Sequence, residues 1–273
     1  MPSQTYLHKR DGVSLIRMPR VSGGQAYATY IHQLAFFGDD DALGITWDGD
    51  PATGQGGRNL WLSTESWPAA SRPALLQIPI EGCNGTGLSP TRVIQCSTLS
   101  QGMSIKDIAW HGSGFFAIIG NTGGALWLVS IGVDGKNLVQ LNTSLPLSPR
   151  AICFDGKIIY LTAQYGGIID VLLLFDTTGT QINAYLVASP TGPGNQPLGV
   201  AWNGCHLAFK SVRTPIDFFL ADVASMPKYR SVQPVLVEST ATPSPTIDYE
   251  QSPVAWDGAF YWSLSSEDQF GGG

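Results

Sequence analysis

The chain of 273 residues is long enough for one large all-β domain or two smaller ones, and 43% aliphatic and aromatic residues can supply its core. Only 13% of its residues are charged and the net charge is -6, which excludes nucleic-acid binding through a basic face. The sequence has no apolar run of about 18 residues, so we expect no membrane span. The N-terminus lacks the apolar stretch of a signal peptide, and we therefore expect the protein to be made in a cytoplasm.

One short pattern occurs five times and organises the chain. It begins with a β-branched residue, continues with a small and then an aromatic residue, and ends in Asp, Asn or His followed by Gly. The copies are residues 45–49, 108–112, 152–156, 200–204 and 254–258. The first three positions favour a buried strand, and the last two favour a tight turn because Asp-Gly and Asn-Gly tolerate positive φ. Each copy therefore predicts a strand that runs into a turn.

The spacing of the copies predicts an all-β fold, a five-bladed β-propeller in a single domain, residues 1–273. The fourth position of the pattern falls at residues 48, 111, 155, 203 and 257, so the gaps are 63, 44, 48 and 54 residues. A four-stranded blade takes about 40–50 residues. We expect blades at residues 43–97, 107–143, 151–188, 198–239 and, for the fifth, 253–265 together with 13–32. The alternative is six blades, with an extra blade in the first gap, although only four strands can be placed there.

The fifth blade is divided between the two ends of the chain. Residues 253–256 and 259–265 supply two strands, and residues 13–18 and 25–32 have strand composition with a Ser-Gly-Gly break between them. Placed beside the C-terminal pair, the N-terminal strands complete the blade and remove the open edge of a linear array. The sequence therefore predicts closure of the propeller by its N-terminal strands.

The polar residue of the pattern is expected to close a turn rather than to catalyse a reaction. Asp48, Asp155 and Asp257 recur at like positions, and His111 and Asn203 replace them in the other two copies. A catalytic carboxylate need not recur in every blade, whereas a turn residue should. The aromatic residue of each copy is expected to pack between blades.

Familiar catalytic and cofactor motifs are absent from the sequence. It contains no G-x-S-x-G elbow, no H-E-x-x-H and no phosphate loop, so no catalytic residue, resident cofactor or metal is predicted. The four cysteines, Cys83, Cys96, Cys153 and Cys205, have no C-x-x-C or metal spacing. We expect them to be small core residues.

Binding residues are expected on the face opposite the repeated turns, where the connections vary in length and composition. The candidates are Trp67, Asn121, Tyr165 and Arg213, together with the acidic loops Asp39-Asp40-Asp41 and Asp248-Tyr249-Glu250. In the expected fold the two acidic loops flank the inner strand of the fifth blade. Their oxygens could bind calcium, and paired carboxylates could serve glycoside hydrolysis. They lack the ligand alternation of a calcium loop, so we interpret them as solvated loops.

A longer motif surrounds the second copy of the pattern. Residues 108–112 are followed by a Gly-x-Phe strand at 114–120, a strand at 124–130 that ends in Ser, and Asp134-Gly135. This arrangement resembles the blades of phage tail and related virion-associated propellers. The pattern is also similar to an Asp-box repeat but departs from it, because Ser130 and Asp134 are four residues apart and the Trp that follows the box is absent. Such patterns occur in lectins and sialidase-like enzymes as well.

The resemblance implies a non-enzymatic structural or attachment protein of a bacteriophage particle, made in the host cytoplasm and located in the virion. Its partners would be other tail or head proteins or a host-surface glycan. The alternatives are a glycan-active hydrolase that uses the acidic loops and a sugar-binding lectin that stacks sugars on Trp67 and Tyr165.

Overall fold

The structure is a computed structural model of the chain. It describes residues 13–19, 29–33, 42–64, 72–80, 90–100, 102–142, 145, 148–165, 169–187, 197–211, 216–222, 231–232, 235–240, 247–248 and 253–267. Every regular element in these ranges is a β-strand. None of the elements described is a helix long and apolar enough to cross a membrane.

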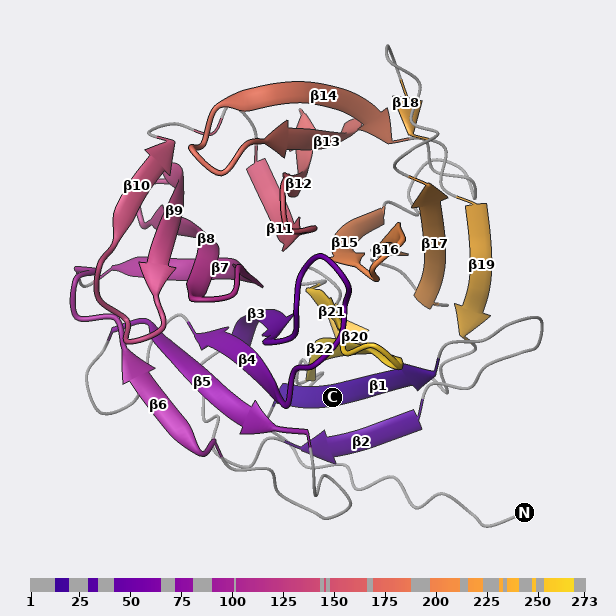
Figure 1. Cartoon of the computed structure of the whole chain (residues 1–273), viewed down its shortest axis with the longest axis horizontal. Coiled ribbons are helices and arrows are strands. Elements are labelled where there is room, and N and C mark those ends of the chain that lie inside the picture. Colours follow the sequence, from indigo (N-terminus) through magenta and orange to yellow (C-terminus); the bar gives the residue numbers. More distant parts are fainter. Residues whose placement is uncertain are drawn as a thin grey trace, which may run out of the picture.

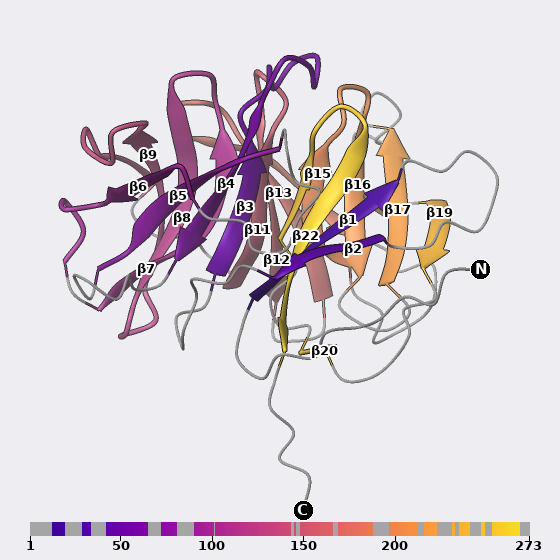
Figure 2. The ribbon, with the colours of Figure 1, turned by 90° about the horizontal axis from the view of Figure 1, so that it is seen from below.

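The strands form five sheets that surround a common centre (Figure 1). Four sheets are built from strands that follow one another along the chain. The first sheet contains β3 (Ala42–Trp47), β4 (Asn59–Thr64), β5 (Ala74–Pro79) and β6 (Arg92–Gln95), and the second contains β7 (Met103–Trp110), β8 (Gly114–Asn121), β9 (Leu126–Gly132) and β10 (Val139–Asn142). The third sheet contains β11 (Ser148–Phe154), β12 (Ile159–Tyr165), β13 (Ile169–Phe175) and β14 (Gln181–Val187), and β18 (Ser231–Val232) pairs with β14 in parallel. The fourth sheet contains β15 (Pro197–Trp202), β16 (His206–Ser211), β17 (Ile216–Asp222) and β19 (Val235–Thr240). Seen from the side, these sheets stand upright around the centre (Figure 2).

The remaining sheet combines strands from the two ends of the chain. It contains β21 (Val254–Trp256), β22 (Phe260–Glu267), β20 (Ile247–Asp248), β1 (Val13–Pro19) and β2 (Thr29–Gln33). β1 runs antiparallel to β22 in a continuous register from Val13 opposite Ser266 to Pro19 opposite Phe260. β2 pairs with the other edge of β1, so the N-terminal strands extend the C-terminal pair outward.

Most strands begin and end within a few residues of the positions expected from the sequence. β1 and β22 begin at Val13 and Phe260, close to the predicted residues 13 and 259, whereas β2 starts at Thr29 rather than at residue 25. The short strands β18 and β20 were not predicted. The inner strands β3, β7, β11 and β15 also each contain a register shift, just before the repeated pattern. A bulge arises from the pairing of two strands, so the pattern along one strand does not reveal it.

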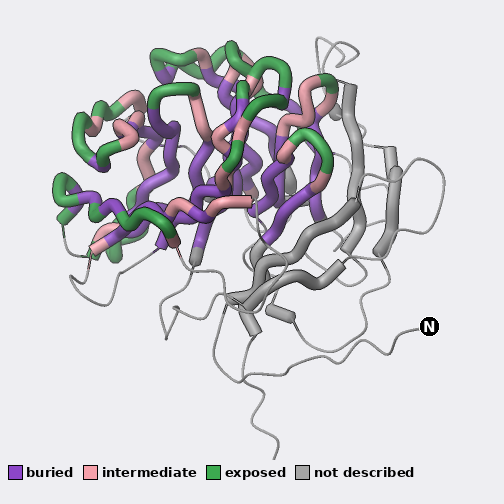
Figure 3. Tube along the Cα trace, turned by 60° about the horizontal axis from the view of Figure 1, so that its bottom comes forward, coloured by how far each residue is buried: buried purple, intermediate pink, exposed green. Residues whose placement is uncertain are grey.

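The core lies between neighbouring sheets, with buried residues along the strands and exposed ones at the turns (Figure 3). Trp110 of β7 stacks on Trp61 of β4 at a centroid distance of 6.5 Å. Phe154 of β11 meets Phe116 of β8 edge-on at 5.0 Å. The predicted packing of the pattern's aromatic residue between sheets is therefore confirmed at these two positions.

The cysteines divide into core and surface residues. Cys96, Cys153 and Cys205 are all free thiols; the first two are buried, as predicted. The prediction is wrong for Cys205, which is exposed because it lies in the turn that follows Asn203. Cys83 lies outside the described residues.

Candidate functional site at the end of the central channel

The five repeated turns have a common hydrogen-bond pattern. In each, the N–H of the Asp, Asn or His donates back across the turn, as Asp155 N does to Ile158 O at 3.3 Å. The side chain then closes the turn from the other side. Asp155 Oδ1 accepts from Lys157 N and Ile158 N, both at 2.7 Å. Asp48, Asn203 and Asp257 each accept two backbone N–H groups in the same way, so the predicted turn role of these residues is confirmed.

The second carboxylate oxygen of each Asp has a partner that the sequence analysis missed. Asp155 Oδ2 accepts from Tyr160 OH at 2.8 Å, and Asp257 Oδ2 accepts from Trp262 Nε1 at 2.6 Å. Asp48 Oδ2 accepts from Asn59 Nδ2 at 2.6 Å and from Trp61 Nε1 at 3.3 Å. All three copies that carry Asp therefore have a hydrogen-bond donor on an aromatic ring of the following strand.

The two copies without Asp have no such donor. Their equivalent positions are Phe116 and Ala208. His111 instead places Nε2 3.3 Å from Ser130 Oγ. Asn203 uses its amide to donate to Tyr261 OH of the neighbouring sheet at 3.0 Å. The choice of turn residue therefore follows the hydrogen-bonding capacity of one position in the following strand, which lies five residues after the turn residue in four copies and 13 residues after Asp48.

The first turn carries an insertion that the other four lack. Asp48 and its bonded Arg58 N are 10 residues apart, whereas Asp155 and its bonded Lys157 N are 2 apart, a difference of eight residues. We call residues 49–57 the cap. Asp50 holds it together, because its carboxylate accepts from Ala52 N at 2.9 Å and Thr53 Oγ1 at 2.8 Å. These bonds hold the pKa of Asp50 below its usual value.

The cap lies against the turns of three other sheets. A Cβ on Gly156 would stand 2.9 Å from Ala52 Cβ, and one on Gly204 would stand 2.7 Å from Thr53 O. A Cβ on Gly258 would stand 2.9 Å from Gly54 O. The three glycines have φ of 96°, 90° and 94°, so they are needed both for the turn and for the approach of the cap. Consecutive cap residues thus contact successive sheets around the axis.

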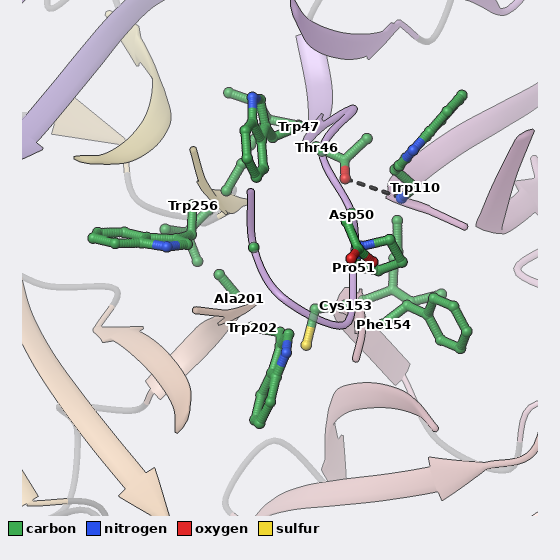
Figure 4. A pocket seen from close by; sticks show the side chains of 17 residues that line it. Thr46, Trp47, Asp50, Pro51, Trp110, Cys153, Phe154, Ala201, Trp202 and Trp256 are labelled. Atoms are coloured by element: carbon green, nitrogen blue, oxygen red, sulfur yellow. Dashed lines mark hydrogen bonds between the residues drawn. The ribbon is translucent and has the colours of Figure 1, made fainter. Parts of the chain in front are cut away.

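A small cavity remains beneath the cap (Figure 4). It is lined by cap residues and by pattern residues of all five sheets, among them Thr46, Trp110, Cys153, Trp202 and Trp256. Its volume is about 50 Å³. Roughly three or four water molecules would fill such a space, and a sugar ring would not enter it. This end of the channel is therefore filled by the chain itself.

Two ionisable side chains are buried deeper between the sheets. Asp107 of β7 accepts from Ile45 N at 3.2 Å, Ile108 N at 2.9 Å and Ile152 N at 2.8 Å. Burial raises the pKa of Asp107 to about 8, although these three backbone donors act in the opposite direction. The equivalent positions in the other sheets are Gly44, Ala151, Gly199 and Pro253. Asp107 therefore joins the inner strands of three sheets, and nothing in the sequence pattern indicated it.

Lys210 occupies the boundary between the fourth sheet and the sheet made from both chain ends. Its Nζ donates to Ser263 Oγ at 2.6 Å, and Ser263 Oγ donates to Pro253 O at 2.9 Å. Burial lowers the pKa of Lys210 to about 7. The contact extends from β16 to β22 and then to Pro253, the residue before β21.

The binding residues expected from the sequence are only partly described. Asn121 ends β8 and is exposed; its Oδ1 accepts from Ala125 N at 3.0 Å, so it shapes the β8–β9 turn. Tyr165 ends β12 opposite Ile169, and Asp248 lies in β20 opposite Ser266. The other seven lie outside the described residues: Trp67, Arg213, Asp39, Asp40, Asp41, Tyr249 and Glu250. Within the described ranges, no three His, Cys, Asp or Glu side chains gather as a metal site would require.

Comparison with known proteins identifies the fold. No protein-family model matches the chain, and no curated protein sequence matches it. A chain in the crystal structure of a nidogen/laminin complex superposes with a TM-score of 0.51 at 14% identity, over 89% of this chain and 82% of that chain. The chain has a β-propeller fold.

Two further structures are similar at a lower level. TolB from Acinetobacter baumannii has a TM-score of 0.46 at 12% identity, over 94% of this chain and 64% of that chain. The β-propeller domain of Cps50 (Swd1) from Myceliophteria thermophila has a TM-score of 0.45 at 10% identity, over 94% of this chain and 93% of that chain. At these identities the likeness concerns the fold alone.

Proposed function

We propose that this propeller is a non-enzymatic binding or assembly module with five blades, closed by its N-terminal strands. Five blades are supported because residues 42–95 contribute one four-stranded sheet, which leaves no described strand for an extra blade in the longest gap. Closure is supported by the pairing of β1 with β22. A closed ring is rigid and presents unlike loops around one rim with little ordering cost on binding.

The cap is the observation that carries the non-enzymatic proposal. Residues 52–54 lie against three turns and leave a cavity of about 50 Å³, too small for a carbohydrate or peptide substrate. The carboxylates at this end are also occupied. Asp155 and Asp257 each accept two backbone N–H groups and one aromatic donor, so their role is to hold the turns.

The partner surface in this proposal is the rim opposite the cap, where Trp67, Tyr165 and Arg213 were expected from the sequence. Asn121, at the end of β8, belongs to the same set. Large contacts of low charge suit a chain with 13% charged residues. The narrower proposal, a tail- or head-associated component of a phage particle, rests on the resemblance of residues 108–135. In that case the partners are virion proteins or a host-surface glycan.

A cation at the acidic loops is a separate proposal with its own test. If Asp39, Asp40, Asp41, Asp248 and Glu250 bound calcium, millimolar calcium would raise the melting temperature by mass action. Replacing Asp40 and Asp248 with Asn would then abolish the rise. We expect no calcium effect, because we interpret these residues as solvated charges.

The deciding experiment runs a pull-down against virion proteins beside an activity screen on bacterial polysaccharides. We expect capture of a tail or head protein and no turnover. Changing Trp67, Tyr165 or Arg213 to Ala should weaken capture without lowering the melting temperature. Lys157→Ala, on the exposed face near the cap, is the matched control and should leave capture unchanged. Turnover that disappears with Asp41→Asn or Asp248→Asn, together with no virion partner, would favour the hydrolase instead.

A further inference from the structure

The sheet made from both chain ends contains a strand pair, β1 with β22, of a kind that the other four described sheets lack. In the other four, neighbouring strands of the main ladder are linked in order along the chain, whereas β1 and β22 come from opposite ends of it. β22 pairs with β21 and β20 on one edge and with β1 on the other. The N-terminal pair β1–β2 is therefore a separable unit that completes the sheet without a covalent link to its neighbour.

We propose that the β1–β2 pair exchanges between copies of this chain, so that the N-terminal strands of one copy complete the last blade of another. This inference rests on the proposed closure of the propeller. The occupant of the β22 edge is fixed by the structure, because the chain's own β1 is seated there in a continuous antiparallel register. A second copy supplies an identical β1, which reproduces every backbone contact of the β1–β22 pair.

The link between β2 and β3 decides how often exchange occurs. Residues 34–41 connect Gln33 to Ala42, a link of eight residues. A short link gives the attached strands an effective concentration in the millimolar range, so dilute protein is expected to close on itself. Exchange becomes competitive when the local concentration of the chain itself approaches the millimolar range.

The same link restricts the geometry of an exchanged pair. Eight residues and their flanking bonds extend at most about 30 Å. β3 of one copy must therefore lie within that distance of the last blade of the other. Reciprocal exchange gives a closed dimer, whereas exchange in one direction gives an open chain of propellers.

Single cysteine variants of the full chain test the exchange directly. Ser14 of β1 lies opposite Ser265 of β22. Directly opposed residues of antiparallel strands have Cα atoms about 4.5–5.5 Å apart, within the range that a disulfide bridges. A Ser14→Cys copy is mixed with a differently tagged Ser265→Cys copy and oxidised. Neither copy alone can form the 14–265 disulfide, so this bond joins two copies only when β1 of one pairs with β22 of the other.

We expect the 14–265 disulfide between copies to increase about tenfold in fraction when the protein concentration rises from about 10 to about 100 µM, as mass action requires. Mass spectrometry of the linked peptides identifies the bond and separates it from disulfides to the native cysteines. The control mixes Ser14→Cys with Ser113→Cys, an exposed turn residue away from this sheet, and should give only background. The adjacent pair Val13→Cys and Ser266→Cys repeats the test if either first variant folds poorly.

A double variant separates failure of the exchange from failure of the closure. Ser14→Cys and Ser265→Cys in one chain should form the disulfide within that chain in dilute solution. An intrachain bond in the double variant, with no bond above background in the mixed single variants, overturns exchange and leaves the closed propeller intact. Absence of the bond in the double variant overturns closure, and exchange with it.

Discussion

The turns at Asp155 and Asp257 share their backbone hydrogen bonds and differ in one partner. Asp155 Oδ2 accepts from a phenol, Tyr160 OH, and Asp257 Oδ2 accepts from an indole, Trp262 Nε1. A phenol can donate or accept a hydrogen bond, whereas an indole N–H can only donate. The two turns therefore require Asp to different degrees. The repeat as a whole reflects this, because Asp is replaced where the equivalent position of the following strand is Phe116 or Ala208, which have no donor.

The largest expected loss comes from removing the indole partner itself. Trp262 is fully buried, so Trp262→Ala should lower the free energy of unfolding by about 3–5 kcal/mol, as large-to-small changes of buried aromatics do. Trp110→Ala is the matched comparison; its ring is only half-buried, and its loss should be smaller. Urea denaturation measures both. Equal losses would mean that burial does not distinguish the two rings.

A second contrast tests whether the cap presses on the turns. Gly204 and Gly112 have similar φ, 90° and 95°, but only the former lies against the cap; a Cβ on Gly112 would have no atom within 4 Å. Both changes to Ala strain the backbone. Gly204→Ala should cost about 1–3 kcal/mol more, the typical effect of overpacking. If Gly112→Ala is as harmful in chemical denaturation, the cap contact does not constrain the turn.

The third contrast exchanges Asp for Asn in the two turns. In Asp257→Asn the new Nδ2 faces an indole N–H that can only donate, so a loss of about 1–3 kcal/mol is expected. In Asp155→Asn the amide can donate to Tyr160 OH, as Asn203 does to Tyr261 OH, and the change should stay within about 0.5 kcal/mol. Thermal unfolding of the pair decides the matter; reversal of the order would refute the role assigned to the partner.

The smallest expected effect, counted per pH unit, is a change in the free energy of unfolding with pH that arises from Asp107 and not from the turn carboxylates. The pKa of Asp107 is raised from 3.8 to about 8, so between these values the folded protein keeps a proton that the unfolded chain releases. Stability contributed by this group is therefore present below pH 3.8 and lost as the pH rises towards 8, by at most about 1.4 kcal/mol per pH unit.

Asp107→Asn should remove this slope, although it also loses an acceptor for one backbone N–H. The difference in unfolding free energy between the unchanged protein and the Asn variant should consequently shrink from pH 5 to pH 8, as measured by denaturation across that range. Trp262→Ala introduces no titrating group, and its deficit should stay constant. A deficit of Asp107→Asn that grows with pH would mean that the three N–H donors stabilise the ionised carboxylate more than burial opposes it.

The sequence predicted the strands and turns well because both depend on neighbouring residues. The β-branched and aromatic residues of the repeated pattern placed the inner strands, and the Asp-Gly or Asn-Gly pairs located the turns at Asp155, Asn203 and Asp257. The donor five residues later was also available in the sequence, since Tyr160 and Trp262 occur at a fixed offset from the Asp. It was missed because the turn and the following strand were considered separately.

The sequence by itself determined a repeated strand-and-turn unit, an apolar core and a chain of low charge. Only the tertiary structure decided the remaining features, because each of them depends on contacts between residues far apart in the chain. Asp107 is satisfied by N–H groups 62 residues before it and 45 residues after it. The path of the cap is set by three turn glycines of other sheets, and the pairing of β1 with β22 joins opposite ends of the molecule. Local pattern encodes neither a close approach of two backbones nor a pairing across the whole chain, so these features appear only once the sheets are assembled.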